Sequence, residues 1–214
     1  MDIENIESSD IKNFQIVIAS KNIHKIREIK TILHELLPNL DILSLIDFPE
    51  YKPLEETGAS FEENASLKAE YAAKTLGRWV ISDDSGLIVP ALEGSPGIYS
   101  ARYAGDKATD ADNRKKLLSN LSKLSDKDRY AYFECCIALA SPEKLIKCVC
   151  AKCEGRIEYQ EKGGEGFGYD PLFVKHDYNK TFSELKESVK NKISHRRKAL
   201  DKILLTLESI ISSS

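Results

Sequence analysis

The sequence of 214 residues lacks any long apolar run and contains one methionine and one tryptophan. No stretch approaches the 18 or more consecutive apolar residues of a membrane-spanning helix. The first residues, Met1 to Asn5, are acidic where a secretory signal would be basic. From these absences we expect no membrane partner and a cytoplasmic protein.

A large excess of charge of one sign is also absent, because 31 basic side chains nearly balance 34 acidic ones. The net charge of −3 indicates neither duplex nucleic acid nor an anionic membrane as partner, so any basic site must be local. The 42% of hydrophobic residues are typical of a soluble globular protein with a full core. We expect a polar N-terminal tail over residues 1–13, and one domain or two closely apposed lobes over residues 14–214.

Cysteines are few and crowded between residues 135 and 153. Their number, five, is odd and argues against a disulfide framework in a long intracellular chain. A zinc site at Cys148-x-Cys150-x-x-Cys153 is conceivable, but it lacks the paired two-residue spacing and a nearby histidine. We favour two strands, residues 130–140 and 145–153, that are joined by a turn at residues 141–144 and use cysteine as a small buried apolar residue.

The apolar pattern elsewhere predicts alternating strands and helices. Strands are expected at residues 14–19, 41–45 and 79–82, the last ending at Asp83-Asp84. Helices are expected after the capping residues Asn22, Ser60, Thr109 and Ser194, with Pro38 and Gly77 ending the first two. Because no internal repeat is present, this mixture indicates an α/β fold.

Acidic residues at expected loops and strand ends indicate a metal site. Asp83 and Asp84 follow an apolar strand, where two like charges are costly unless a cation or hydrogen bonds neutralise them. Together with Glu55-Glu56 and Glu63 they offer hard oxygen ligands that suit Mg²⁺ beside substrate phosphates. Two alternatives stay open: an Asx turn at Asp83-Asp84, and a purely helix-capping role for Glu63.

The segment from Ser20 to Lys25 lies between the first strand and the first helix, where α/β proteins hold phosphate on helix N-terminal amides. It is not a Walker loop, since it has no glycine run. Ser20 and Asn22 are candidate donors, and Lys25 supplies positive charge. The alternative is an ordinary strand-to-helix turn with a capping asparagine.

A second polar region combines the segment Gly163 to Pro171 with residues at the start of the last helix. The segment has glycines for close approach, Phe167 for stacking, and Asp170 to accept hydrogen bonds from a base edge. Lys190, Ser194, His195 and Arg196 add cationic and donor groups, although His195-Arg196 can also be a solvated helix end. Phosphate donors, acidic ligands and an aromatic pocket together indicate a nucleotide site.

Six motifs in sequence order then show a specific resemblance. They are Ser20-x-Asn22-x-x-Lys25, Glu55-Glu56-Thr57-Gly58-x-x-Phe61-x-x-Asn64-Ala65-x-x-Lys68-Ala69, Asp83-Asp84-Ser85-Gly86-Leu87, Gly94-x-Pro96-Gly97-Ile98-Tyr99-Ser100-Ala101-Arg102-Tyr103, Gly166-Phe167-Gly168-Tyr169-Asp170-Pro171 and Ser194-His195-Arg196. From about Phe14 to the last helix, the chain resembles the bacterial Ham1 or inosine triphosphate pyrophosphatase family.

The resemblance implies an elongated mixed β-sheet with flanking helices, in which two lobes of a single nucleotide pyrophosphatase domain enclose the active site in the cleft between them. It also implies a homodimer. The implied activity is Mg²⁺-dependent hydrolysis of the non-standard purine nucleoside triphosphates ITP, dITP and XTP to the monophosphate and pyrophosphate. Such an enzyme keeps inosine and xanthine out of DNA and RNA.

The same resemblance implies roles for individual residues. Glu56 and Asp84 would bind Mg²⁺, Asp84 would also be the base that activates water, and Lys68 and Ser85 would contact phosphate or assist the metal. The triphosphate would be held by Ser20, Lys21, Asn22, Ile23, His24 and Lys25. The base would be bound by Phe167, Gly168, Tyr169, Asp170, Lys190, His195 and Arg196.

One departure from the family lies in the phosphate segment, because Ser20-Lys21-Asn22 stands where Thr-Gly-Asn is common. Lys21 adds a positive charge and a Cβ at a position often filled by glycine. Two other functions are weighed: a Maf-type pyrophosphatase acting on pyrimidine or modified nucleotides, and a nucleotide-sensing module without catalysis. The base-binding motifs oppose the first, and the acidic residues Glu56 and Asp84 oppose the second.

Overall fold

The computed structural model describes residues 14–213, so the expected polar tail over residues 1–13 lies outside the described residues. Six strands form one sheet in the order β2-β1-β3-β4-β5-β6. The strands are β1 (Gln15–Ile18), β2 (Asp41–Ser44), β3 (Val80–Ile88), β4 (Tyr130–Ala140), β5 (Leu145–Ile157) and β6 (Phe173–Lys175). Strand β1 pairs in parallel with β2 and β3, whereas β3, β4, β5 and β6 pair antiparallel.

Five α-helices accompany the sheet within residues 14–213. They are α1 (Ile23–Leu36), α2 (Phe61–Leu76), α3 (Asp110–Leu121), α4 (Glu187–Ile193) and α5 (His195–Ile211). Short 3₁₀ helices include η1 (Leu45–Asp47), η3 (Gly97–Arg102) and η5 (Phe182–Glu184). In the described part of the chain, no helix is both long and apolar enough to cross a membrane.

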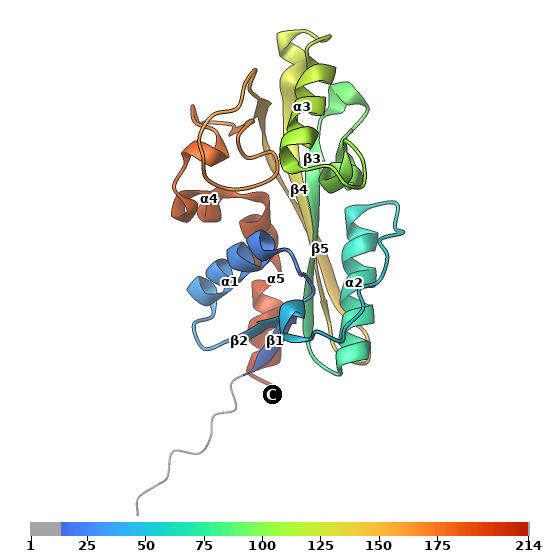
Figure 1. Cartoon of the computed structure of the whole chain (residues 1–214). Helices are drawn as coiled ribbons and strands as arrows, with labels where there is room; N and C mark the ends of the chain where they lie inside the picture. The colour runs from blue at the N-terminus through green and yellow to red at the C-terminus, as the bar shows by residue number, and fades with distance from the viewer. Residues whose placement is uncertain (1–13, 214) are drawn as a thin grey trace, which may run out of the picture.

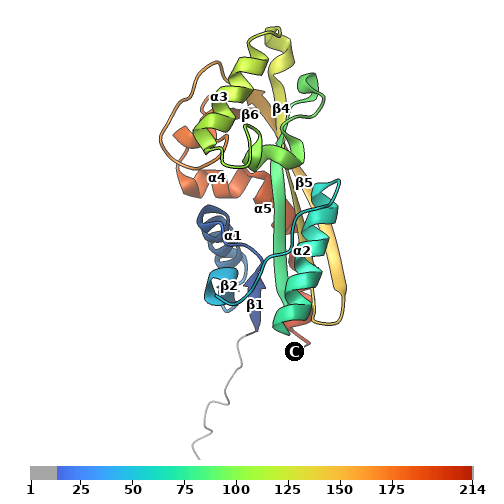
Figure 2. The ribbon, with the colours of Figure 1, turned by 45° about the vertical axis from the view of Figure 1, so that its right-hand side comes forward.

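The molecule is elongated, and the long strands β3, β4 and β5 run through both of its lobes (Figure 1). One lobe contains β1, β2, α1, α2 and α5, and the other contains α3, α4, β6 and the η3 segment. Turning the molecule by 45° shows α1 and α2 on opposite sides of the long strands (Figure 2). The expectation of a mixed α/β sheet with two lobes is therefore confirmed.

The helix boundaries follow from local capping, as expected. The Asn22 side chain accepts hydrogen bonds from the backbone N–H groups of His24 and Lys25 at the start of α1. Ser60 caps α2, which ends at Gly77 in the left-handed conformation that favours glycine (φ +62°). Thr109 caps α3, and Ser194 caps α5.

Three apolar clusters form the core. One lies between the sheet and the helices α1 and α5, and a second lies between the other face of the sheet and α2. The third fills the other lobe and contains Leu117, Phe133 and Phe173. Because the long strands contribute to all three clusters, both lobes share one sheet and the cleft between them has a rigid floor.

The expected end of the third strand at Asp83-Asp84 is wrong. Strand β3 continues to Ile88, and each of its residues pairs with β4, including Asp84 with Cys136. The Asx turn is excluded by the same pairing. An interior strand tolerates two carboxylates here because successive side chains point to opposite faces of the sheet, where different cations neutralise them.

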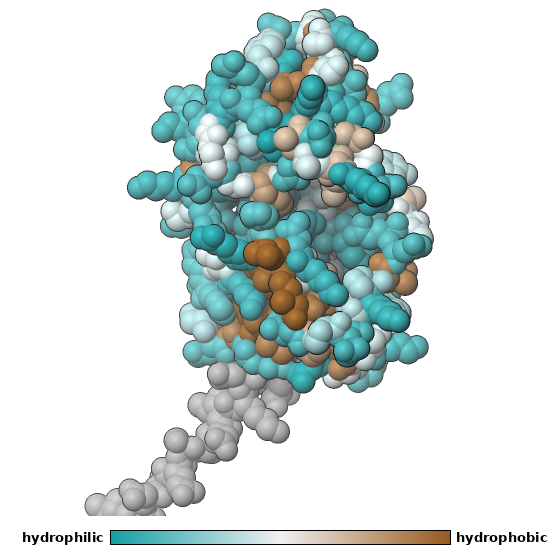
Figure 3. All heavy atoms as spheres, viewed as in Figure 1, coloured by the Kyte–Doolittle hydropathy of each residue, from teal (hydrophilic) through white to brown (hydrophobic). Residues whose placement is uncertain are grey.

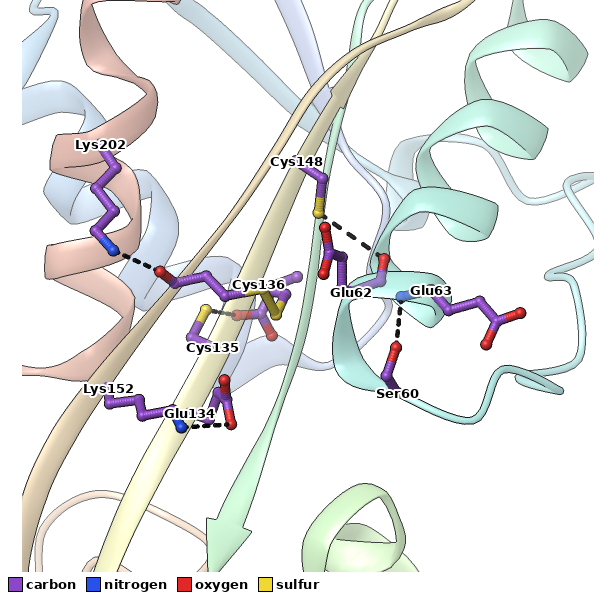
Figure 4. The surroundings of a disulfide bond; sticks show 11 residues. Ser60, Glu62, Glu63, Glu134, Cys135, Cys136, Cys148, Lys152 and Lys202 are labelled. Atoms are coloured by element: carbon purple, nitrogen blue, oxygen red, sulfur yellow. Dashed lines mark hydrogen bonds and ion pairs between the residues drawn. A yellow bond between two sulfur atoms is a disulfide. The ribbon is translucent and has the colours of Figure 1, made fainter.

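The cysteine prediction holds only in part. Cys135 and Cys153 are buried free thiols, as expected of small apolar residues. Cys136 and Cys150, however, form a disulfide between the adjacent strands β4 and β5. Figure 4 shows this bond beside Cys148, which points to the first turn of α2. The odd number of cysteines gave no indication of this disulfide, because the bond depends on which residues of β4 and β5 lie opposite each other.

The sequence pattern missed two short elements, β6 and α4. Strand β6 has three residues and α4 has seven, too few for a clear periodicity. Their effect is nevertheless large, since α4 carries Lys190 and ends at Ser194 directly before α5.

Candidate active site

The cleft between the lobes contains two adjoining pockets, and Figure 3 shows a hollow on this face between the two lobes. The acidic pocket is lined by Ser20, Lys21, Asn22, Lys25, Glu56, Lys68, Asp83, Asp84, Ser85 and neighbouring residues. The aromatic pocket is lined by Asp110, Phe133, Phe167, Gly168, Tyr169, Asp170, Lys190, His195, Arg196 and neighbouring residues. Asn22, Lys25 and Ser85 line both pockets. The pockets therefore form one continuous cleft.

At the centre of the acidic pocket, the Lys68 ammonium lies between two carboxylates. Its Nζ is 2.9 Å from Oε1 of Glu56 and 2.8 Å from Oδ1 of Asp84, and it also donates to the carbonyl of Asp83. Burial lowers the pKa of Lys68, but Asp84 and Glu56 more than offset this and raise it. For Asp84, burial raises the pKa above the ordinary value of 3.8 despite the nearby Lys68.

The residues present fit a Mg²⁺ ion. Glu56 and Asp84 place carboxylate oxygens around a single cation, the ammonium of Lys68, so their side chains already converge on a position of positive charge. Mg²⁺ is commonly bound by one or two carboxylates together with substrate phosphates and water. The residues from 14 to 213 hold no group of three or more metal-ligating side chains. Glu56 and Asp84 are the two carboxylates that could hold such an ion in this pocket.

Asp83 faces the other side of the sheet from Asp84. Its carboxylate is 2.6 Å from Nζ of Lys25 and 3.1 Å from Nε of Arg196, and it accepts from the thiol of Cys135. Burial alone would raise the pKa of Asp83, but Arg196 and Lys25 hold it well below its ordinary value. Asp83 is therefore ionised and paired with Arg196 and Lys25. It lies on the opposite face of β3 from Glu56 and Lys68.

Glu28 in α1 is a functional candidate that the sequence analysis missed. It is 5% exposed, lies 2.5 Å from Nζ of Lys190 and binds a terminal nitrogen of Arg196. Lys190 in turn lies 2.5 Å from Asp170. One signal was available, because Glu28 lies four residues before Ile32 in the stripe of residues that α1 buries.

These contacts define the charged cluster of Glu28, Asp83, Asp170, Lys25, Lys190 and Arg196. It contains three acidic and three basic side chains, so its charges balance. Such balance is needed because unpaired buried charges are strongly destabilising. The alternative that His195-Arg196 is a solvated helix end is excluded, since both side chains are buried. Lys190 and Arg196 line the aromatic pocket while bonded to these carboxylates.

The expected phosphate segment is held at the end of β1. Ser20 accepts a hydrogen bond from the backbone N–H of Asn22, and Asn22 caps α1. Lys21 adopts no positive φ, so its Cβ is tolerated without glycine-like geometry, and its ammonium donates to the carbonyl of Tyr51. The structure places Ser20, Lys21, Asn22 and Lys25 in the acidic pocket.

Ile23 and His24 do not line this pocket with them. Neither residue belongs to the lining of the acidic pocket. The Ile23 side chain is 69% exposed, and the His24 ring stacks on Phe167 with ring centroids 5.2 Å apart. The helical turn explains the difference, because successive side chains on a helix point about 100° apart.

The loop that carries Phe167 is fixed through its backbone. The Phe167 N–H donates to Asp170, the Gly168 N–H donates to Asp110 at 2.7 Å, and Arg114 donates to the Gly168 carbonyl at 2.9 Å. Gly166 has φ +80°, and a Cβ there would collide with the Asp170 carboxylate. Helix α3, which the sequence analysis did not connect with the site, thus binds both the N–H and the carbonyl of Gly168.

His195 and Tyr169 complete the aromatic pocket. The His195 ring stacks on Phe133 at 4.7 Å between centroids, and burial together with Arg196 holds its pKa well below 6.5. Its Nδ1 is buried and has no hydrogen-bond partner among residues 14–213. The Tyr169 hydroxyl donates to the Ser100 carbonyl, which gives it a structural role in joining the loop to η3.

Comparison with known proteins identifies close relatives of this cleft and fold. The model of the Ham1 family matches residues 16–205. A dITP/XTP pyrophosphatase of Protochlamydia amoebophila is 55% identical over 197 residues, covering 92% of this chain and 98% of that protein. One of Chlamydia trachomatis serovar L2 is 52% identical over 200 residues, covering 93% and 95%.

Solved structures of Ham1 proteins are also similar to this fold. The Staphylococcus aureus Ham1 protein has a TM-score of 0.79 at 43% identity, covering 91% of this chain and 98% of its own. A HAM1 protein from Coxiella burnetii has a TM-score of 0.81 at 39% identity, covering 92% and 99%. The motifs, the fold and the full-length matches lead to one conclusion: the chain belongs to the Ham1 family.

Proposed function

We propose that this protein is a Mg²⁺-dependent nucleoside triphosphate pyrophosphatase that hydrolyses ITP, dITP and XTP to the monophosphate and pyrophosphate. The observation that carries the proposal is the continuous cleft. A centre of two carboxylates and a lysine lies at one end, and a pocket with an aromatic ring and buried polar groups lies at the other. A nucleotide carries phosphates at one end and a base at the other, and relatives that are 52–55% identical are named dITP/XTP pyrophosphatases.

In this account the triphosphate lies in the acidic pocket. Lys21 and Lys25 supply positive charge for phosphate oxygens, and Ser20 and Asn22 supply polar groups at the start of α1. Glu56 and Asp84 would hold a Mg²⁺ ion, and when bound this ion would neutralise charge that develops on the phosphates. Lys68 stays beside both carboxylates and keeps them ionised and oriented.

Asp84 is the proposed general base. It orients the water that attacks the α-phosphorus, and it accepts a proton as the new P–O bond forms and the bond to pyrophosphate breaks. Its raised pKa suits a proton acceptor better than the strongly lowered pKa of Asp83 does. The paired, buried Asp83 is a structural neighbour in this mechanism.

The purine base lies in the aromatic pocket, where it stacks on Phe167. Lys190 and Arg196 face this pocket as donors, and inosine and xanthine offer the O6 acceptor to such donors, whereas adenine offers an amino group. A buried polar site that is left unpaired by the wrong base can discriminate strongly.

We further propose that the enzyme acts in the cytoplasm as a homodimer and so keeps inosine and xanthine out of nucleic acids. The apolar segment of η3 supports the dimer, because the ring of Tyr99 is 56% exposed. A Maf-type preference for pyrimidines is disfavoured by the purine-reading residues of the aromatic pocket. A purely sensing role leaves the buried carboxylate of Asp84 without a purpose.

Hydrolysis in ¹⁸O-labelled water tests the proposed reaction. The protein, ITP and Mg²⁺ are incubated in H₂¹⁸O, and the products are separated and weighed by mass spectrometry. Attack at the α-phosphorus places one ¹⁸O in inosine monophosphate and none in pyrophosphate. Label in pyrophosphate, or release of orthophosphate, would refute the mechanism.

A further inference from the structure

The rings of His24 and Phe167 meet across the cleft. His24 belongs to the first turn of α1 in one lobe, and Phe167 belongs to the loop that α3 holds in the other lobe. Their planes are within 16° of parallel, and their centroids are 5.2 Å apart. This is an offset-stacked pair, the favourable geometry for two aromatic rings.

The two faces of Phe167 have different surroundings. Phe167 lines the aromatic pocket, but His24 does not. Both rings line a separate cavity that also contacts Arg27, Glu28 and Glu187. His24 therefore stacks on one face of Phe167, while the Phe167 ring still lines the aromatic pocket.

The support from His24 matters because the loop fixes only the backbone of Phe167. Asp170 binds its N–H group, and Asp110 and Arg114 hold the next peptide, but none of these contacts sets the ring. The ring itself contacts His24 and the ammonium of Lys190, which lies 4.8 Å from the ring centroid.

His24 also connects this ring with the phosphate segment. Its backbone N–H donates to Oδ1 of Asn22 at 3.0 Å, so both residues belong to one capped helical turn. Asn22 lines both pockets. A shift of this turn therefore moves the phosphate contacts and the support of Phe167 together.

We propose that His24 is a positioning residue for the nucleobase: it backs Phe167, so that base, Phe167 and His24 form a three-layer stack that joins the two lobes. The inference deepens the proposed function and rests on it. It replaces a phosphate-binding role for His24 and makes the first turn of α1 the element that links triphosphate binding to base binding.

The test compares wild type with His24→Ala, with His24→Phe, which keeps a stacking ring without a charge or a ring nitrogen, and with His34→Ala, an exposed histidine later in the same helix. Steady-state hydrolysis of ITP gives KM and kcat. Inorganic tripolyphosphate, which has no base, is used as a competitive inhibitor. Calorimetry gives the Kd of inosine monophosphate for each protein.

We expect His24→Ala to raise the KM for ITP and the Kd of the monophosphate by about 3- to 10-fold, the scale of one aromatic pair, with little change in kcat. His24→Phe restores both values, His34→Ala changes neither, and inhibition by tripolyphosphate is unchanged.

Two outcomes would overturn the proposal. If His24→Ala weakened inhibition by tripolyphosphate as much as it raised the KM for ITP, His24 would act in phosphate binding. If His24→Ala lowered the KM for ITP, His24 would block the base. If wild type fails to hydrolyse ITP, the proposed function is wrong. The Kd of inosine monophosphate for each variant still tests whether His24 supports base stacking.

Discussion

The pKa values of two neighbouring carboxylates, Asp83 and Asp84, are shifted in opposite directions. The two side chains point to opposite faces of β3. Arg196 and Lys25 hold Asp83 ionised, whereas burial raises the pKa of Asp84. A single residue step along one strand thus separates a structural charge from a candidate base. This separation allows their roles to be tested with matched substitutions.

We expect Asp84→Asn to lower kcat for ITP by roughly 10²-fold or more, the scale of a lost general base. Its melting temperature should be unchanged or higher, because an amide is less costly to bury than the carboxylate. Asp83→Asn is the matched control, and we expect it to lose about 3 kcal/mol of stability because it leaves Arg196 and Lys25 undercompensated. Near-normal turnover of Asp84→Asn would refute the assignment.

Glu28 provides a prediction on pH. Burial raises its pKa, but Arg196 and Lys190 together hold it below the ordinary value of 4.5. A lowered acid pKa adds stability that is present above pH 4.5 and is lost as the pH falls through the folded value. Glu28→Gln should therefore cost about 3 kcal/mol at pH 7, and the gap to wild type should shrink in acid. Urea unfolding at pH 7, 5 and 3.5 measures the gap, and a constant gap would contradict the account.

At this scale, the sequence indicated residue types better than their partners. Glu56, Asp83, Asp84 and Phe167 were singled out by residue type and line the cleft, whereas Lys68 was indicated by the family resemblance alone. The partners of Arg196 were not visible, since Glu28 and Asp83 lie 168 and 113 residues away along the chain. Only the packing of α1 and α5 on the sheet brings them together.

Among the elements, α3 has an unexpected influence on the site. Its Asp110 and Arg114 bind the N–H and the carbonyl of Gly168, so one helix face sets the backbone beside Phe167. The capping pattern at Thr109 predicted where this helix begins, but it gave no information on what the first turn contacts. Caps are local, whereas the position of a helix depends on the whole fold.

We expect Asp110→Ala to loosen the loop at residues 163–170 and to raise the KM for ITP about 5-fold, consistent with the loss of one charge-assisted hydrogen bond. Hydrogen exchange at Gly168 should become faster, and kcat should change less than KM. Lys115→Ala, an exposed position on the same helix, is the control. Unchanged exchange at Gly168 in Asp110→Ala would show that the loop is held by other contacts.

The strands show where local pattern reading fails. A run of Asp-Asp-Ser-Gly is typical of a turn, yet β3 passes straight through it because β4 pairs with every residue. The polar side chains there serve the cleft. Departures from local preference are expected at functional sites, and in this chain the mistaken strand end coincides with the candidate base.

For the whole molecule, composition and periodicity predicted a mixed α/β protein of one domain or two closely apposed lobes, and only the family resemblance favoured two lobes. The reason is physical: the lobes arise because β4 and β5 have 11 and 13 residues and extend through both cores. Strand length beyond the usual five or six residues was visible only in part, since β5 continues past Cys153 through polar alternation.

The oligomeric state is a prediction at the same scale. We expect a homodimer, because the η3 segment leaves the ring of Tyr99 exposed and because the family resemblance implies one. Light scattering at micromolar concentration should give about twice the chain mass of 24.0 kDa. Tyr99→Asp should shift the mass toward the monomer. A wild-type mass near 24.0 kDa would contradict the dimer.

Base selection tests the central claim most directly. Pyrophosphate release is measured with Mg²⁺ and equal concentrations of ITP, XTP, GTP, ATP, CTP and UTP. We expect ITP and XTP to be hydrolysed well above GTP, and about 10²- to 10⁴-fold faster than ATP at limiting substrate, because adenine presents an amino group where inosine and xanthine present the O6 acceptor to Lys190 and Arg196. Hydrolysis of ATP as fast as ITP would contradict this claim.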